Sequence, residues 1–205
     1  MNGKINVIEY IDSGTDEYLI RSFLENKPEA FDTLITRYKN RIFNLCYRFL
    51  GHHEDANDCA QETFIKACKH LKNFKFQSSF YTWLYTIAVN TCKNRLNSRE
   101  MRHRKYMFST DQPVNTEDGM LMPELKSTGP TPFVQTAQKE EDKQIQEEIN
   151  ALSEDYKTII LLRDIEGFSY DEIASITNLK MGTVKSKIAR ARDVLKEKLK
   201  RRNIL

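Results

Sequence analysis

Prolines divide this chain in two, because four of the five fall within one stretch from Met107 to Lys139. The same stretch holds glycine, serine, threonine and asparagine residues, and no apolar period is sustained across it. Proline removes a backbone donor and restricts the residue before it, so a regular helix or a central strand rarely runs through such a segment. This composition is typical of a linker, and we expect two domains joined by it.

Both flanks of the linker show apolar side chains at three- and four-residue spacing, which predicts amphipathic helices. Pro28 is expected to open one helix at its first position, and Gly51 to close it. Further helices are predicted from about Glu54 to Leu71 and from near Phe80, and four shorter helical segments follow the linker. No segment shows sustained two-residue alternation, so the predicted fold is all-α: two small helical domains and a flexible linker.

The 205 residues suffice for two small domains, and 40% hydrophobic content suits a globular chain. We expect an N-terminal extension over residues 1–15 and a first domain over residues 16–105. A linker over residues 106–140 and a second domain over residues 141–205 complete the predicted organisation.

Basic residues are bunched, although the net charge is only +3. One cluster comprises Arg95, Arg99, Arg102, Arg104 and Lys105, and the other runs from Lys185 to Arg202 with only Asp193 and Glu197 opposing it. Two positively charged stripes on a nearly neutral chain indicate a protein that binds a polyanion at two places. The alternative is that both are solvated helix faces.

The sequence gives no sign of a membrane segment or of a metal site. No apolar run approaches the roughly 20 residues that cross a bilayer, and Met1–Tyr10 lacks the pattern of a signal peptide. We therefore expect a cytoplasmic protein without membrane insertion. The four cysteines form no C-x-x-C pair and are interpreted as small buried apolar groups. His52 and His53 lie near Cys59 without a second ligand pair, so we expect no metal and no cofactor.

The C-terminal part has the pattern of a helix-turn-helix. Ser169 and Glu172 form a capping box, Asn178 breaks the chain, and a last helix is predicted from around Gly182 or Thr183. One face of that helix, predicted to pack inward, carries Val184, Ile188, Ala191 and Leu195. The candidate DNA-contacting residues are Thr183, Lys185, Ser186, Lys187, Ala189 and Arg190. Helical hairpins in ordinary cores have a similar pattern, but the basic outer face favours DNA binding.

A dense aromatic stretch covers residues 74–90. Some of its rings must be core, since Phe80 shares a helix face with Leu84 and Ile87. The opposite face is polar and basic, and aromatic rings at its edges suit the stacking of unpaired bases. The loop before this helix could hold one extruded base. Candidates from the loop and the helix are Phe76, Ser78, Ser79, Tyr81, Trp83, Tyr85, Asn90 and Lys93.

The helix predicted from Glu54 carries an acidic face. Asp55, Asp58 and Glu62 recur at three- and four-residue spacing with Gln61 beside them. Acids near a helix start also stabilise the helix dipole, so this pattern alone does not specify a partner. A basic partner helix is the functional alternative.

Taken together, three stretches resemble the extracytoplasmic-function (ECF) group of the sigma-70 family of bacterial RNA polymerase sigma factors. They are DANDCAQETFIKACKHL from Asp55, FYTWLYTIAVNTCKN from Phe80, and the run from Leu152 to Arg192. The departures include Met181, where the family commonly has proline, and Thr86, where arginine is common. Because of these departures, the promoter sequence of a relative is not transferred to this chain. The resemblance to the family does not depend on them.

The resemblance implies a protein that catalyses nothing itself and gives promoter recognition to core RNA polymerase. Asp55, Asp58, Gln61 and Glu62 would bind the clamp helices of the largest polymerase subunit. The aromatic candidates would open and read the −10 element as region 2, and the last helix would read the −35 element as region 4, which also grips the polymerase flap. An anti-sigma factor is the further expected partner. The expected location is the cytoplasm, in association with the nucleoid or held at the membrane by the anti-sigma factor.

Two rival functions remain from the residues alone. An ordinary helix-turn-helix regulator would explain the last helix but not the aromatic stretch, and it would form no stable complex with core polymerase. A helical enzyme acting on nucleic acid would need a paired-carboxylate metal site, a phosphate-cradling glycine loop or an activated nucleophile, and the sequence offers none of these.

Overall fold

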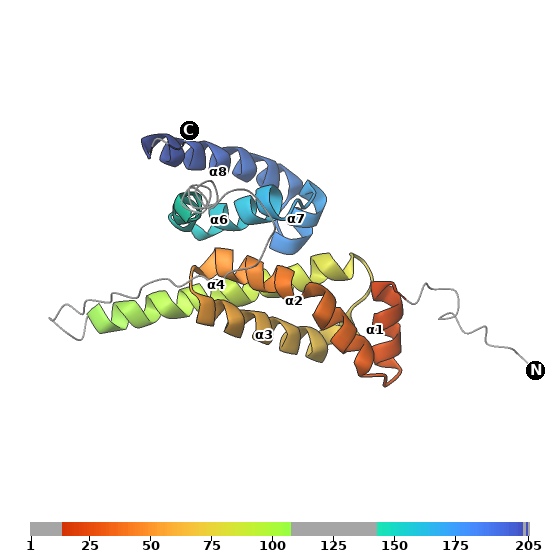
Figure 1. Ribbon diagram of the computed structural model, residues 1–205. Helices are drawn as coiled ribbons and strands as arrows, with labels where there is room; N and C mark the ends of the chain where they lie inside the picture. The colour runs from red at the N-terminus through yellow and green to blue at the C-terminus, as the bar shows by residue number, and fades with distance from the viewer. Residues whose placement is uncertain (1–13, 108–142, 203, 205) are drawn as a thin grey trace, which may run out of the picture.

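The computed structural model describes residues 14–107, 143–202 and 204, which form two groups of helices (Figure 1). No strand occurs in these described ranges, so the all-α prediction is confirmed. The predicted N-terminal extension and linker lie almost wholly outside the described residues. The same holds for the side chains of Arg99, Arg102, Arg104 and Lys105 in the first basic cluster.

The first group is a bundle of four helices: α1 (Asp16–Leu24), α2 (Glu29–Leu50), α3 (His53–His70) and α4 (Phe80–Met107). A 3₁₀ turn over Leu71–Asn73 follows α3. Pro28 is the N-cap of α2, one residue earlier than predicted, and Gly51 ends that helix in the left-handed conformation with φ 72°. Glycine suits this position because a side chain there would be strained.

The bundle core consists of the predicted apolar faces. Leu34, Ile42 and Leu45 of α2 have no exposed surface. The buried stripe of α3, which includes Ala56, Ala60 and Ala67, packs against α2. Three of the four cysteines, Cys46, Cys59 and Cys92, are also fully buried. They fill small spaces between α2, α3 and α4, as expected for apolar groups.

The second group contains a helix over residues 143–150, then α6 (Glu154–Ile160), α7 (Tyr170–Thr177) and α8 (Met181–Arg201). A π-helical segment, Leu161–Ile165, extends α6. Both hydrogen bonds of the predicted capping box at the start of α7 are present, and Asn178 ends α7 in the left-handed conformation. The tight turn into α8 therefore follows directly from these cap residues.

The second group packs on α2 and α4 of the first (Figure 1). Part of this contact satisfies the C-terminal carbonyls of α2, which lack helical partners. Gln146 Nε2 donates to the Arg48 carbonyl at 2.9 Å, and Lys157 Nζ donates to the Phe49 carbonyl at 3.2 Å. The two domains thus share specific hydrogen bonds as well as apolar area.

Candidate nucleic-acid and polymerase interfaces

Helix α8 separates a buried face from an exposed one, as predicted. Val184, Ile188 and Ala191 are buried against the preceding helices, and Leu195 packs beside them. The helix starts at Met181, one residue before the earlier of the two predicted starts. The exposed side chains on the other face are Lys185, Ser186, Ala189 and Arg190, with Thr183 half-buried at the helix start. Between Thr183 and Arg190 the exposed side chains include no large apolar group, so this part of the helix can approach a DNA groove closely; Val194, one turn further on, is 38% exposed.

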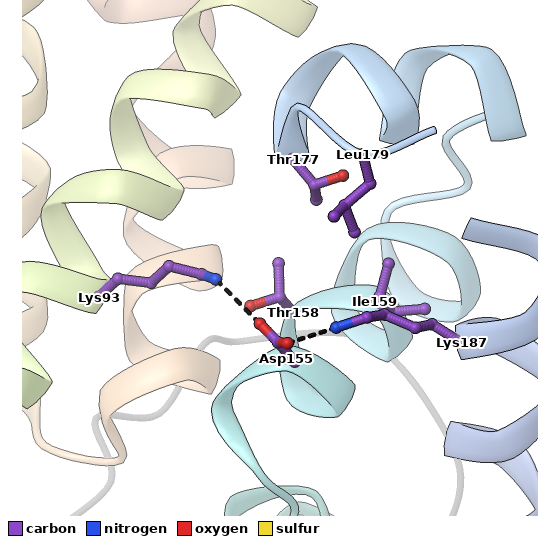
Figure 2. Close-up of a pocket in the computed structure, with 7 residues that line it drawn as sticks. All are labelled: Lys93, Asp155, Thr158, Ile159, Thr177, Leu179 and Lys187. Carbon is purple, nitrogen blue, oxygen red and sulfur yellow. Dashed lines mark hydrogen bonds and ion pairs between the residues drawn. The ribbon is translucent and has the colours of Figure 1, made fainter. Parts of the chain in front are cut away.

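Lys187 differs from its neighbours on α8 because an acid of the same domain holds it. Its ammonium forms an ion pair with Asp155 at the start of α6. The same pair lowers the pKa of Asp155, chiefly through the hydrogen bond from Lys187. In this structure Lys187 is therefore paired with an acid of the protein itself rather than directed to solvent (Figure 2).

The loop before α4 exposes one aromatic ring in a strained conformation. Phe76 is 38% exposed and adopts φ 54°, a region that residues with a side chain rarely occupy. Its ring lies 4.8 Å from that of Phe74, and the Arg21 guanidinium sits 5.0 Å from the Phe76 centroid. Strain of this kind persists where the surroundings impose it, often at functional sites. Ser79 is exposed and Ser78 half-buried in the same loop.

Trp83 belongs partly to the core. Its ring packs 5.1 Å from Phe74 and 5.8 Å from Phe80, and it is half-buried. Asn90 is exposed further along α4. Of the two, only Asn90 therefore presents an unobstructed side chain.

The polar face predicted on α4 is partly covered in the structure, although the stacking of bases would require it to be accessible. Tyr85 and Thr82 are buried, and Tyr81 and Lys93 are half-buried, because the second domain lies on this face. Burial and the hydrogen bond to Glu166 raise the pKa of Tyr85, and burial raises that of Tyr81. Both phenols therefore remain protonated donors at neutral pH.

The acidic face of α3 is partly neutralised by the protein itself. Asp58 and Gln61 are exposed, whereas the Asp55 side chain is only 16% exposed. Arg95 of α4 lies 3.7 Å from Asp55 and 3.4 Å from Asp58, so this member of the predicted basic cluster contacts acids. Glu62 pairs with Lys66 at 2.7 Å. The side chains of Asp58 and Glu62 nevertheless remain 60% and 46% exposed, and surface ion pairs of this kind are weak.

Several residues of these surfaces were not predicted from the sequence. Ile65 is 54% exposed on α3, one turn beyond Gln61, and its only sequence signal is that it falls off the buried stripe of that helix. Glu166 and Phe168, which cover α4, lie in a short connection between α6 and α7 without any apolar period. Nothing local in the sequence indicates their partners.

Within the described ranges, no cluster of histidine, cysteine or acidic side chains could hold a metal ion. In the same part of the chain, every helix is too short or too polar to cross a bilayer.

Comparisons with known proteins agree with the two-domain arrangement. The family described as sigma-70 region 2 matches residues 34–102, and the family described as sigma-70, region 4 matches residues 142–195. The ECF RNA polymerase sigma-E factor of Haemophilus influenzae is 36% identical over 185 residues, which are 90% of this chain and 95% of the relative. The RNA polymerase sigma-H factor of Pseudomonas aeruginosa is 35% identical and spans 90% of this chain and 93% of its own.

A solved structure gives the same result. The sigma factor RpoE of Bartonella quintana, crystallised with the anti-sigma factor NepR, superposes with a TM-score of 0.64 at 25% identity. The match covers 83% of this chain and 96% of that one.

These matches define the class of the protein as a transcription initiation factor. The chain belongs to the ECF group of the sigma-70 family. It is an RNA polymerase sigma factor, which binds core polymerase and directs initiation at promoter DNA.

Proposed function

We propose that α8 reads the −35 element through Thr183, Lys185, Ser186, Lys187, Ala189 and Arg190. The observation that carries this assignment is the division of α8 into a buried apolar face and an exposed basic one. Small side chains at Ser186 and Ala189 let the helix lie close to base edges, and Arg190 can reach guanine acceptors. Region 4, over residues 141–205, would hold this helix and grip the polymerase flap.

Region 2, over residues 16–105, would open and read the −10 element. Phe76 offers an exposed ring for stacking on an unpaired base, and Ser78, Ser79 and Asn90 can donate to base edges. Tyr81, Tyr85 and Lys93 would join this surface once the second domain has left it, and the half-buried Trp83 would lie at its edge. We therefore expect the protein to bind core polymerase first and to open the DNA strands afterwards.

The α3 face would dock on the clamp helices of the largest polymerase subunit. Asp58 and Gln61 are exposed there, with Glu62 and Asp55 beside them. Ile65 adds an exposed apolar group one turn beyond Gln61. Protein interfaces usually combine apolar contacts with charged and polar ones.

The protein would act by binding alone, without catalysing a reaction, in the cytoplasm where core polymerase works. An anti-sigma factor is the proposed inhibitor, since the structurally similar RpoE was solved with one. Such a partner could also retain the protein at the membrane.

Run-off transcription with core RNA polymerase on a randomised promoter library tests this function. We expect transcripts that require both the protein and core enzyme and that select two short elements at a fixed spacing. Selection of a single element, or none, would contradict the assignment of one promoter element to each domain.

A further inference from the structure

The exposed ring of Phe76, in the loop before α4, contacts an arginine of α1. The Arg21 guanidinium lies over this ring, with Cζ 5.0 Å from the ring centroid. A guanidinium in this position is attracted by the negative face of the ring. The ring of Phe74 lies 4.8 Å from the same centroid and is itself buried. Phe76 is thus held by one cation and one ring, while 38% of its surface stays exposed.

An acid one turn earlier in α1 orients the Arg21 guanidinium. Arg21 Nε and Nη2 both donate to Glu17 Oε1, at 3.0 Å and 2.6 Å. Two charge-assisted hydrogen bonds from one guanidinium fix its direction better than a single bond would. The side chains of Arg21 and Glu17 are 37% and 46% exposed, so the pair lies at the surface beside the Phe76 loop.

Helix α1 is a firm support for this pair. Leu19 and Ile20 are buried in the core of the first domain. Asp16 accepts hydrogen bonds from Tyr38 and Arg37 of α2, which ties the first turn of α1 to the longest buried helix beside it. The position of the Arg21 backbone is therefore set by the bundle rather than by the loop that it contacts.

The backbone of Phe76 needs such outside contacts. Its φ is 54°, and in the described ranges the other residues besides glycine with positive φ are Asn26 and Asn178. Asparagine tolerates this region better than a bulky aromatic residue does. A strained residue of this kind persists only where the surroundings hold it, often at functional sites. Arg21 and Phe74 are the side chains whose contacts with the Phe76 ring provide that support.

Resting on the proposed function, we propose that Arg21 is a positioning residue for opening the −10 element. Oriented by Glu17, its guanidinium holds the Phe76 ring where an unpaired base stacks on it. A ring that is already in place binds a base without first losing its own freedom of rotation. The Glu17–Arg21 pair therefore extends the −10 site from the loop and α4 onto α1.

Two substitutions of opposite charge separate this positioning role from simple attraction of phosphates. Arg21→Gln removes a positive charge and Glu17→Gln removes a negative one, but both break the pair. Positioning requires that both lower run-off transcription from a closed promoter with core polymerase. The loss should be about two- to fivefold for Arg21→Gln, as expected for an exposed cation–π contact, and smaller for Glu17→Gln. Charge attraction alone would make Glu17→Gln more active than wild type.

A second exposed ion pair provides the matched controls. Lys27 and Glu25 follow α1, lie 3.8 Å apart and have side chains 53% and 46% exposed. Lys27→Gln and Glu25→Gln make the same two charge changes away from the Phe76 ring and should leave run-off near the wild-type value. Circular dichroism with thermal melting verifies that all four variants are folded, and a template mismatched around −10 should restore the two pair variants.

Phe76→Leu tests whether Arg21 acts through the ring. This variant removes the aromatic face and should lower closed-template run-off about fivefold or more, because a base stack is lost. Adding Arg21→Gln to Phe76→Leu should then cause no further loss, since coupled residues are not additive. A direct measurement on the isolated chain uses fluorine NMR with 4-fluorophenylalanine placed at Phe76. Its resonance should shift in Arg21→Gln and Glu17→Gln but not in Lys27→Gln.

Each result decides between two readings. An unmoved fluorine resonance in both pair variants, opposite effects of Arg21→Gln and Glu17→Gln on run-off, or full additivity with Phe76→Leu would overturn the positioning role. A defect in Phe76→Leu without one in Arg21→Gln would overturn that role and leave the proposed −10 function of the loop intact. Normal closed-template activity of Phe76→Leu would refute the loop's −10 function and the role of Arg21 together.

Discussion

Single substitutions in α8 can distinguish contacts that read the DNA sequence from contacts that only attract its phosphates. Arg190 is exposed on α8, pointing away from the buried Val184 face. Arg190→Ala should cost the holoenzyme about 1–3 kcal/mol at a −35 site and relax its preference at one base pair, because a bidentate contact to guanine would be lost. Competition binding against single-base promoter variants measures both effects.

Lys200→Ala is the matched change near the end of the same helix, where Lys200 is exposed. It should weaken binding evenly across those promoter variants and flatten the salt dependence by about one phosphate contact, because a point charge carries no sequence information. A uniform loss for Arg190→Ala as well would mean that Arg190 contacts phosphate rather than a base.

Phe76 permits a test of strand opening that leaves the fold intact. Phe76→Gly removes an exposed ring and also relieves a left-handed conformation that costs roughly 1–2 kcal/mol for a residue with a side chain. Its thermal stability should stay near that of wild type. Run-off transcription from a closed promoter should fall, since a base stack worth about 1–3 kcal/mol is lost, and a template mismatched around −10 should restore it.

Asn90→Ala, which also changes an exposed side chain, should follow the same pattern of closed-template loss and bubble-template rescue. Trp83→Ala is a poorer test, because Trp83 packs on Phe74 and Phe80 and its loss should destabilise the bundle by up to about 3–5 kcal/mol. If Phe76→Gly and Asn90→Ala fail equally on both templates, the aromatic loop has no part in opening DNA.

Spacing within a helix predicted which of its residues share a face, but not which distant segment packs on that face. The α8 core face and the capping box of α7 follow from spacings within one helix, and both were predictable. The covered face of α4 was not, since Tyr85 is buried by residues 81 and 83 positions away along the chain. Arg95 likewise pairs with acids of α3 that only the tertiary fold brings near. Local periodicity specifies which residues share a face, but not which distant segment covers it.

The acidic face of α3 can be tested as one unit. Changing Asp58 and Glu62 together to lysine should abolish tight binding to core polymerase, because like charges facing a basic helix cost several kcal/mol at an interface. The control reverses Glu29 and Asp32, two exposed acids in the first turn of α2, and so makes the same change in net charge. Pull-down titrations with core enzyme should separate the two double variants, and identical affinities would remove α3 from the docking surface.

The start of α7 allows a prediction of stability and of its pH dependence. Ser169→Ala should lower the free energy of unfolding by about 1 kcal/mol, because the Ser169 side chain caps the Glu172 N–H. The hydrogen bond from the Ser169 N–H lowers the pKa of Glu172, so the Glu172 carboxylate stabilises the fold above its ordinary pKa. That contribution is lost as the pH falls through the lowered value.

Urea unfolding at several pH values measures both effects. The acid-dependent loss of stability should be smaller in Glu172→Gln, whose side chain does not titrate. Ser186→Ala, an exposed serine within α8, is the control and should change stability by less than about 0.5 kcal/mol. Equal losses for the two serine variants would show that the Ser169 cap adds nothing specific.

In the whole molecule, the second domain contacts the first at the C-terminal end of α2 and near the start of α4. Gln146 and Lys157 donate to the last carbonyls of α2, while Glu166 and Phe168 cover the start of α4. A side chain on Gly51 would also approach Asn150 Nδ2 to 3.2 Å, so the chain is closely packed at this junction. The start of α4, which we propose to read the −10 element, cannot contact DNA while Glu166 and Phe168 cover it.

The free protein should therefore bind duplex promoter DNA poorly and bind it well once joined to core polymerase. Two separate causes contribute to this difference. The closed contact covers part of the region 2 surface, and the two DNA-binding surfaces gain from each other only when their spacing is fixed. Fluorescence anisotropy with a duplex promoter, measured with and without core enzyme, gives the size of the combined effect.

The Glu166→Lys variant loses the acceptor of the Tyr81 and Tyr85 hydroxyls and should open the contact between the domains, so it separates the two causes. Glu197→Lys makes the same charge change on an exposed side chain of α8 and is the control. Opening the chain should raise the affinity of the free protein for duplex promoter only slightly, because the duplex has no unpaired base for Phe76 or Tyr85 and the spacing of the domains is still not fixed. The same variant should bind single strands about tenfold better, because the covered rings of Tyr81 and Tyr85 become accessible. Core enzyme should then increase duplex affinity in Glu166→Lys nearly as much as in wild type. If the opened free chain already bound duplex promoter as tightly as the holoenzyme, occlusion alone would explain the weak binding, and fixing the spacing by polymerase would contribute nothing.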